Sequence, residues 1–145
     1  MIRGIVPGLM LLGLSGCSLI PLPWLPDPDP GKAWIDLHSV DDSRLQAMAT
    51  DRQPLRDTRY FEVTPGTHQL ELLARFTVQP QDVGGSHSIR RDCQLNIEYH
   101  DFSAGSRYRL EAGHYGFLPW ARLHDSSGQL LAQGKPAGCH SHEPS

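Results

Sequence analysis

The sequence contains no run of basic residues and no apolar run long enough to span a membrane. Lys and Arg number 13 against 16 Asp and Glu, so the 145-residue chain has a net charge of −3. With an acidic net charge and no basic run it lacks the electrostatic signature of nucleic-acid binding, and we expect no nucleic-acid partner. Its most apolar stretch, near the N-terminus, holds roughly ten to twelve apolar residues, whereas a membrane-spanning helix needs about 20.

The motifs of several common enzyme classes are also missing. There is no Gly-x-Ser-x-Gly elbow, no phosphate-binding Gly-rich loop and no His-Glu-x-x-His helix. His100-Asp101 and His124-Asp125 are adjacent pairs, and neighbours on a strand point to opposite faces. Ser86-His87-Ser88 offers hydroxyls beside an imidazole, with no acid positioned to orient it. We predict a protein that is not an enzyme and uses no cofactor.

The N-terminal segment has the layout of a secretory signal. Met1-Ile2-Arg3 is a short positively charged start, and residues 4–14 are mostly apolar. Leu14-Ser15-Gly16-Cys17 then places an apolar residue and two small residues directly before a cysteine. This segment resembles the lipobox of bacterial lipoproteins, and the resemblance covers residues 1–18. The alternatives are an ordinary secretory signal and a buried helix that ends in cysteine.

The resemblance implies that residues 1–16 are removed as a signal peptide, which leaves 129 residues beginning at Cys17. Lipoproteins of this type carry a diacylglyceryl group on the cysteine thiol and usually an N-acyl chain. Several acyl chains give stable membrane anchoring, where one gives only marginal binding. Ser18 stands where an aspartate is associated with retention in the inner membrane. We therefore expect an outer-membrane anchor with the domain facing the periplasm.

Residues 17–31 form a proline-rich tether behind the lipidated cysteine. Its prolines (Pro21, Pro23, Pro26, Pro28 and Pro30) lack backbone donors and bias the preceding residues to extended geometry. Such a segment is a semi-rigid spacer of about 3.1 Å per residue, with a reach of roughly 40 Å. Two alternatives remain: a proline-rich ligand for an aromatic groove, or a segment that inserts Trp24 into the membrane interface.

From Lys32 onward, apolar and polar residues alternate with the period of half-buried strands. We predict strands at 33–38, 45–49, 60–63, 68–78, 93–100, 107–112, 117–123 and 129–132, with Pro119 interrupting the penultimate one. The breaks lie at 41–43, 51–54, 64–67, 103–105, 113–116 and 125–128, with a longer loop at 79–91. A short helix through Met48 is the alternative for the second strand.

Short strands at near-regular spacing favour an all-β fold. We predict a single antiparallel β-sandwich, with the architecture of Ig-like or transthyretin-like domains, over residues 32–139, followed by a disordered tail at 140–145. With Cys17 assigned to the lipid, Cys93 and Cys139 form an even pair, which favours one disulfide in an oxidising compartment. Two unpaired thiols are the alternative.

Two segments resemble a known family of small domains. Residues 63–72 resemble the V-x-P-G-x-H-x-L hairpin of PEGA-type and related β-sandwich domains of bacterial surface proteins, and residues 104–110 resemble their A-G-x-x-Y-x-L hairpin. Residues 32–139 are similar to small lipoproteins of Gram-negative bacteria. The family often has Asp-Gly in an earlier hairpin, where this chain has Asp51-Arg52, so we expect a looser turn. The resemblance implies no catalytic residues.

Aromatic residues concentrate at positions 115–120, beside Gly116 and Pro119. Tyr115, Phe117 and Trp120 form the candidate partner surface, for a sugar or a protein. The alternative places these rings in the core, where most aromatic residues of a small domain lie.

Other polar groups offer further candidate sites. Cys139, His140 and His142 carry thiolate and imidazole groups that suit zinc or copper, although a tail position and a disulfide argue for no metal. His68 and His87 have no spaced acidic partner. Four arginines (Arg90, Arg91, Arg107 and Arg109) form either a basic patch on one sheet face or a solvated face with cross-strand ion pairs to Glu98 and Glu111.

The leading functional hypothesis is a lipid-anchored, non-enzymatic envelope lipoprotein that acts as a binding or accessory module. Its partner is an envelope protein or the cell wall, on the periplasmic side. The alternatives are a periplasmic inhibitor or chaperone-like factor, and a metal-binding lipoprotein that uses Cys139, His140 and His142.

Replacing the predicted lipidation site tests the anchor. Cys17→Ser removes the thiol that accepts the diacylglyceryl group, so the variant should accumulate as an unprocessed, unlipidated precursor. Intact-mass measurement of the membrane fraction distinguishes the two forms. Normal maturation of Cys17→Ser would sink the lipoprotein prediction.

Overall fold

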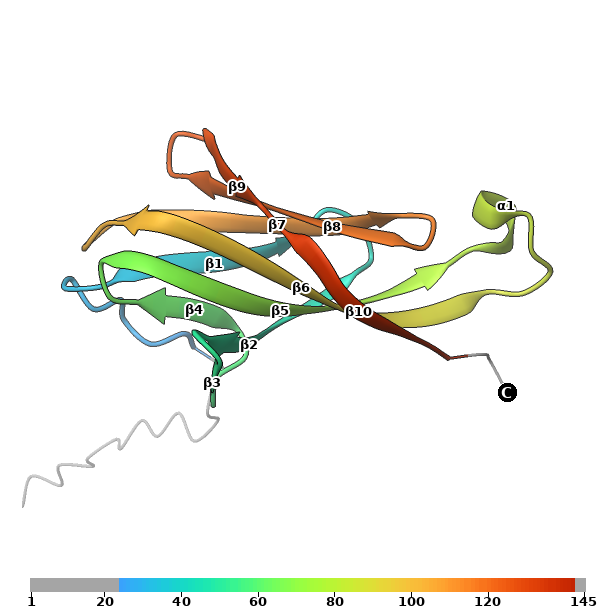
Figure 1. Ribbon diagram of the computed structural model, residues 1–145, viewed down its shortest axis with the longest axis horizontal. Coiled ribbons are helices and arrows are strands. Elements are labelled where there is room, and N and C mark those ends of the chain that lie inside the picture. Colours follow the sequence, from blue (N-terminus) through green and yellow to red (C-terminus); the bar gives the residue numbers. More distant parts are fainter. Residues whose placement is uncertain (1–23, 143–145) are drawn as a thin grey trace, which may run out of the picture.

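Residues 24–142 are described by a computed structural model, in which two β-sheets pack face to face (Figure 1). Cys17, the predicted signal peptide and the start of the tether lie outside the described residues. The elements are β1 (Ala33–Ser39), β2 (Arg44–Thr50), β3 (Gln53–Pro54), β4 (Tyr60–Val63), β5 (Gly66–Val78), α1 (Pro80–Val83), β6 (Ile89–Phe102), β7 (Arg107–Tyr115), β8 (Leu118–Asp125), β9 (Leu130–Gln133) and β10 (Lys135–His142). The predicted all-β sandwich is confirmed.

Each sheet has five strands among the described residues. Sheet A has the order β4-β1-β7-β8-β9, and sheet B has the order β10-β6-β5-β2-β3. Every pairing is antiparallel except that of β1 with β7, which is parallel. The parallel pair arises because β7 enters sheet A after the chain has crossed over from sheet B, in the direction that β1 already follows.

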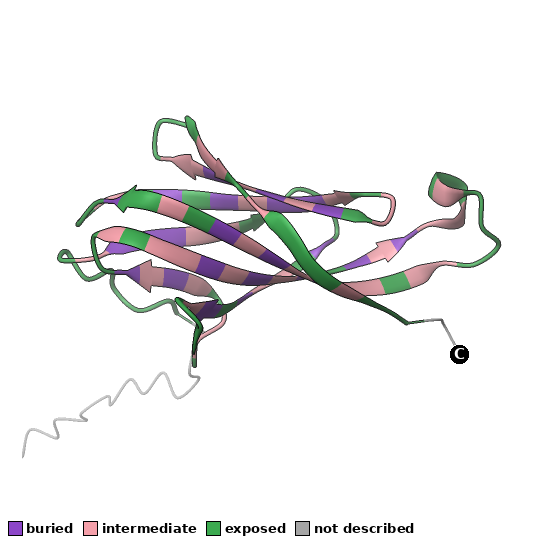
Figure 2. Cartoon of the chain, viewed as in Figure 1, coloured by how far each residue is buried: buried purple, intermediate pink, exposed green. Residues whose placement is uncertain are grey.

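Strict alternation along the strands produces the core between the sheets (Figure 2). The largest fully buried side chains are Phe61, Phe102, Ile35, Leu70, Leu72, Leu95, Leu110, Leu123, Val78 and Cys93. Burial of each large apolar side chain contributes roughly 1.5–3 kcal/mol. Leu70, Leu72 and Ala74 share one buried face of β5, as the alternation within the predicted strand at 68–78 requires.

Two segments predicted as hairpins join different sheets instead. Residues 64–65 lead from β4 in sheet A to β5 in sheet B, and residues 103–106 lead from β6 back to β7 in sheet A. Gly66 and Gly105 have positive φ values of 114° and 73°, which glycine adopts without steric cost. The Tyr108 hydroxyl accepts a hydrogen bond of 2.9 Å from the Ser103 amide, the arrangement of a tyrosine corner.

Three predicted breaks in the chain, at 113–116, at Pro119 and at 79–91, differ from the structure. β7 runs through Tyr115, so the break expected at 113–116 is confined to Gly116 and Phe117. Pro119 lies inside β8 without interrupting it. The neighbouring strand β9 pairs only with residues 122–124, so Pro119 lies at an open edge, where its missing donor is tolerated. The loop at 79–91 contains the single helical turn α1, and β6 already begins at Ile89.

The final strand, β10, is missing from the sequence prediction. It runs through Lys135–His142 along β6, so residues 140–142 are strand and not the expected tail. Pro136 and Gly138 are residues typical of breaks between strands, so the sequence pattern does not predict a strand here. In the structure, a register irregularity between them accommodates both residues. The pairing sets Cys139 opposite Cys93, and the predicted disulfide joins them.

Removal of the disulfide should lower the stability of the domain. Cys93 and Cys139 are 46 residues apart, and a loop of that length corresponds to about 4 kcal/mol of unfolded-state entropy. We expect the Cys93→Ala/Cys139→Ala variant to lose up to about 4 kcal/mol in urea unfolding. An unfolding midpoint equal to that of the wild type would contradict the structural role of the bridge.

Candidate functional site

The β7–β8 hairpin presents exposed rings on the outer face of sheet A. Tyr115 and Leu118 pair across the hairpin and are 67% and 69% exposed. The Tyr115 ring centroid lies 6.0 Å from that of Trp120, with 24° between the planes. The Arg122 guanidinium carbon lies 4.6 Å from the Trp120 ring centroid. We call Tyr115, Leu118, Trp120 and Arg122 the aromatic surface.

Gly113 explains how the Trp120 indole lies on this face. The two residues are register partners, and a Cβ atom on Gly113 would come within 2.9 Å of the Trp120 ring. The indole therefore occupies the space that a side chain at position 113 would fill. This close approach orients Trp120 before any ligand binds.

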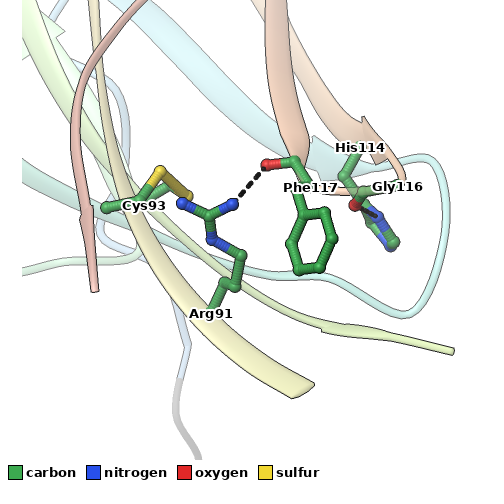
Figure 3. Close-up of a disulfide and its surroundings, with 6 residues drawn as sticks. Arg91, Cys93, His114, Gly116 and Phe117 are labelled. Carbon is green, nitrogen blue, oxygen red and sulfur yellow. Dashed lines mark hydrogen bonds between the residues drawn. A yellow bond between two sulfur atoms is a disulfide. The ribbon is translucent and has the colours of Figure 1, made fainter. Parts of the chain in front are cut away.

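Phe117, the third residue of the predicted partner surface, lies apart from the other two. Its ring is half-buried and packs against the core. The Arg91 guanidinium lies 5.2 Å from the ring centroid and donates a 3.2 Å hydrogen bond to the Phe117 carbonyl (Figure 3). The structure thus brings Tyr115 and Trp120 together and directs Phe117 between the sheets.

Trp34, unlike Tyr115, is a buried aromatic residue of sheet A. It is only 2% exposed and stacks on Tyr60, with centroids 4.2 Å apart. Asp36 accepts hydrogen bonds from the Trp34 indole and from Arg107. The Arg107 hydrogen bond is the largest influence on the Asp36 carboxyl and holds its pKa below the ordinary value. This cluster closes over Trp34, so its indole offers no surface to a ligand.

Asp41, Asp42 and His114 form a group that sequence reasoning missed. Their potential ligand atoms lie within 4.8 Å of one another. The His114 Nδ1–H donates to the Gly116 carbonyl over 2.9 Å, and its Nε2 lies 3.6 Å from Asp41 Oδ2. Imidazole and carboxylate oxygens suit a divalent metal.

The Asp41 carboxylate already has several partners within this group. It accepts hydrogen bonds from the amide and hydroxyl of Ser43 and from the His114 amide. Burial raises the pKa of Asp41, but these hydrogen bonds outweigh burial and lower the pKa below the ordinary value. The group therefore attaches the β1–β2 loop to the end of β7.

His68 has an acidic partner, contrary to the sequence interpretation. The pairing of β2 with β5 brings Asp51 to it, and His68 Nδ1 lies 2.5 Å from Asp51 Oδ2. The His68 Nε2–H donates to the Thr64 carbonyl over 2.7 Å, and the Thr64 hydroxyl oxygen lies 3.0 Å from the same nitrogen. Because this nitrogen carries the hydrogen, it does not serve as a base for the Thr64 hydroxyl. The Asp-His-Thr chain is a structural clamp.

The Asp51-Arg52 turn is tighter than the looser turn expected from its departure from the Asp-Gly pattern of PEGA-type hairpins. Both residues have positive φ, 49° and 68°, and they form the whole connection between Thr50 and Gln53. Asp51 also accepts a 2.8 Å hydrogen bond from the Gln69 amide. These contacts hold a non-glycine turn in a conformation that usually requires glycine or asparagine.

The remaining predicted sites are also separated. Cys139 is in the disulfide, so it offers no thiolate to a metal beside His140 and His142; His142 instead lies 3.3 Å from Asp92. The four predicted arginines form no common patch, because Arg107 and Arg109 extend from sheet A whereas Arg90 and Arg91 belong to sheet B. Arg109 does lie 3.2 Å from Glu111, but both residues belong to β7, so this ion pair runs along one strand and is not one of the predicted cross-strand pairs.

Comparisons with known proteins find no matching family model, no matching curated protein and no matching solved structure. The resemblances to lipoproteins and to PEGA-type domains stay predictions. Within residues 24–142, no helix has the length and apolar character required to cross a membrane.

The clamp predicts a pH dependence of stability. A hydrogen bond from Gln69, and to a lesser extent one from His68, lowers the pKa of Asp51 below its ordinary value. The ionised Asp51 therefore contributes fully to the free energy of unfolding above the unfolded pKa of about 4. This contribution is lost as the pH falls through the pKa of the folded state. Asparagine tolerates the same positive φ, so Asp51→Asn removes the charge without straining the turn. This substitution should lower the free energy of unfolding at pH 7 by about 1 kcal/mol or less.

Urea unfolding at pH 7 and pH 2 measures this difference. We expect it to vanish at pH 2, where both proteins carry a neutral side chain at position 51. Asp101→Asn, at an exposed position on β6, is the matched control. An equal difference at both pH values would show that the charge is not responsible.

Proposed function

We propose that the chain is a lipid-anchored, non-enzymatic binding module of the bacterial envelope. The anchor is Cys17, the membrane is the outer membrane, and the sandwich faces the periplasm. The lipobox and the proline-rich tether support this proposal, together with the Cys93–Cys139 disulfide, which suits an oxidising compartment. A tether reach of roughly 40 Å gives the domain access to material beyond the membrane surface.

The aromatic surface is the observation that carries a binding role. Tyr115 and Leu118 each expose about two thirds of their area side by side on one hairpin. Adjacent exposed apolar side chains of this kind are costly to keep in water and mark interaction sites. The indole of Trp120 extends this surface along the same outer face of sheet A.

A glycan of the cell wall is the ligand class that this surface fits best. The exposed Tyr115 ring, nearly parallel to that of Trp120, offers a flat face to the C–H face of a sugar ring. Arg122 borders the rings and its register partner Glu111 lies beside it, so hydrogen-bonding groups adjoin the apolar faces. The packing of Trp120 across Gly113 keeps the indole in place, which lowers the entropy lost on binding.

Co-sedimentation with purified cell-wall sacculi tests this function. The full chain, kept in uncharged detergent micelles, should sediment with the sacculi. Tyr115→Ala should weaken binding about fivefold, which corresponds to roughly 1 kcal/mol for one lost aromatic contact. Tyr115→Phe keeps the ring and should bind like the wild type.

Leu130→Ala is the matched control, because Leu130 is also exposed (45%) but lies on β9. Sedimentation of Tyr115→Ala equal to that of the wild type would overturn the glycan assignment. If the wild type does not sediment but crosslinks through position 115 to one envelope protein in cells, the partner is a protein.

A further inference from the structure

A groove of about 530 Å³ lies at one end of sheet B, on the sheet opposite the aromatic surface. It is lined by Asp42, Arg44, Arg75, Phe76, Thr77, Arg90, Asp92 and His142. These residues come from β2, β5, β6, β10 and the loop before β2. Most of its lining is polar or charged, and three arginines contribute to it.

The strand register places the arginines next to one another. Arg44 of β2 is the direct cross-strand partner of Arg75 on β5. One strand further, Thr77 pairs with Arg90 and Arg75 pairs with Asp92, so Arg90 is the diagonal neighbour of Arg75. Side chains at such positions are within reach of one another, and like charges placed directly opposite destabilise a sheet.

Acidic side chains neutralise this group only in part. Asp92 lies 3.7 Å from the Arg75 guanidinium and 3.3 Å from the His142 imidazole. In the part of the chain that the structure describes, no ion pair involves Arg44 or Arg90. With Asp42 and Asp92 as its only acidic groups, the groove lining carries a net positive charge before His142 is counted.

We propose that this groove binds a phosphate group, through Arg44, Arg75 and Arg90. Guanidinium groups are planar forks of donors that match phosphate oxygens. Inorganic phosphate or a phosphate monoester offers at least three non-bridging oxygens to three guanidiniums, whereas a carboxylate offers two oxygens and one negative charge. Bound phosphate also removes the repulsion between Arg44 and Arg75. This inference does not depend on the proposed glycan site, which lies on the other sheet.

The groove has a base of paired strands and donors that are exposed to solvent. Its base is the β5–β6 pair, the longest ladder of the sandwich, and the Cys93–Cys139 disulfide fastens β10, which carries His142, to β6. The three arginines are exposed, so their guanidiniums are free to orient around an anion without disturbing the core.

Titration with inorganic phosphate tests the proposal directly. The full chain in uncharged detergent micelles is followed by NMR of the histidine rings. The His142 resonances should shift saturably because His142 lines the groove, while those of His38, an exposed residue on sheet A, should not.

Paired variants identify the binding groups. Arg44→Gln/Arg90→Gln removes two exposed guanidiniums and should weaken phosphate binding by at least about tenfold, because each makes charged hydrogen bonds. Arg56→Gln/Arg109→Gln makes the same change in net charge away from the groove and should stay within about twofold of the wild type. Arg44→Lys/Arg90→Lys keeps the charge but not the fork, and should give an intermediate affinity.

A second arm distinguishes a soluble phosphate from a lipid headgroup. The full chain is reconstituted in vesicles of phosphatidylcholine, with or without one fifth phosphatidic acid, whose headgroup is a phosphate monoester, and its thermal unfolding midpoint is measured. An increase that needs phosphatidic acid and is lost in Arg44→Gln/Arg90→Gln assigns the phosphate to a lipid headgroup. The proposal is overturned if neither source binds, or if the groove variant and its matched control respond alike.

Discussion

The burial of two inner sheet faces against each other is the constraint on which the rest of this structure depends. Successive side chains of a strand point to opposite faces, so each residue that faces the core places its neighbours on the outer face of the sheet. Because Leu110 and Ala112 are buried, Glu111 faces outward on sheet A. The burial of Ala74 and Phe76 likewise directs Arg75 outward on sheet B. Both proposed sites are consequences of the register that completes the core.

Contacts between distant segments then give these outer faces a defined shape. Gly113 lets the Trp120 indole lie across the strand next to it, and the Cys93–Cys139 bridge holds the last strand beside β6. The corner at Tyr108 returns the chain from one sheet to the other. The aromatic surface and the arginine groove thus lie on different sheets of one rigid unit, and a ligand on one leaves the other accessible.

Most strands were predictable because alternation is a local signal. It located the strands that end at Val63, Val78 and Asp125, and their turn residues, to within a few positions. The last strand was missed because its alternation is obscured by Pro136 and Gly138. The sequence predicts hairpins at the two corners, residues 64–65 and 103–106, because turn residues indicate that the chain reverses. Turn residues do not indicate which sheet the following strand joins.

The sequence by itself determined the period of the strands and the positions of most tight turns, and it favoured the pairing of the two cysteines. Each depends on residue type and near neighbours, or on counting. Only the tertiary structure decided that Asp51 meets His68, that Arg44 faces Arg75, and that Tyr115 and Phe117 lie on opposite sides of their hairpin. These contacts depend on which strands pair and in which register, and that choice is made by burial over the whole sandwich.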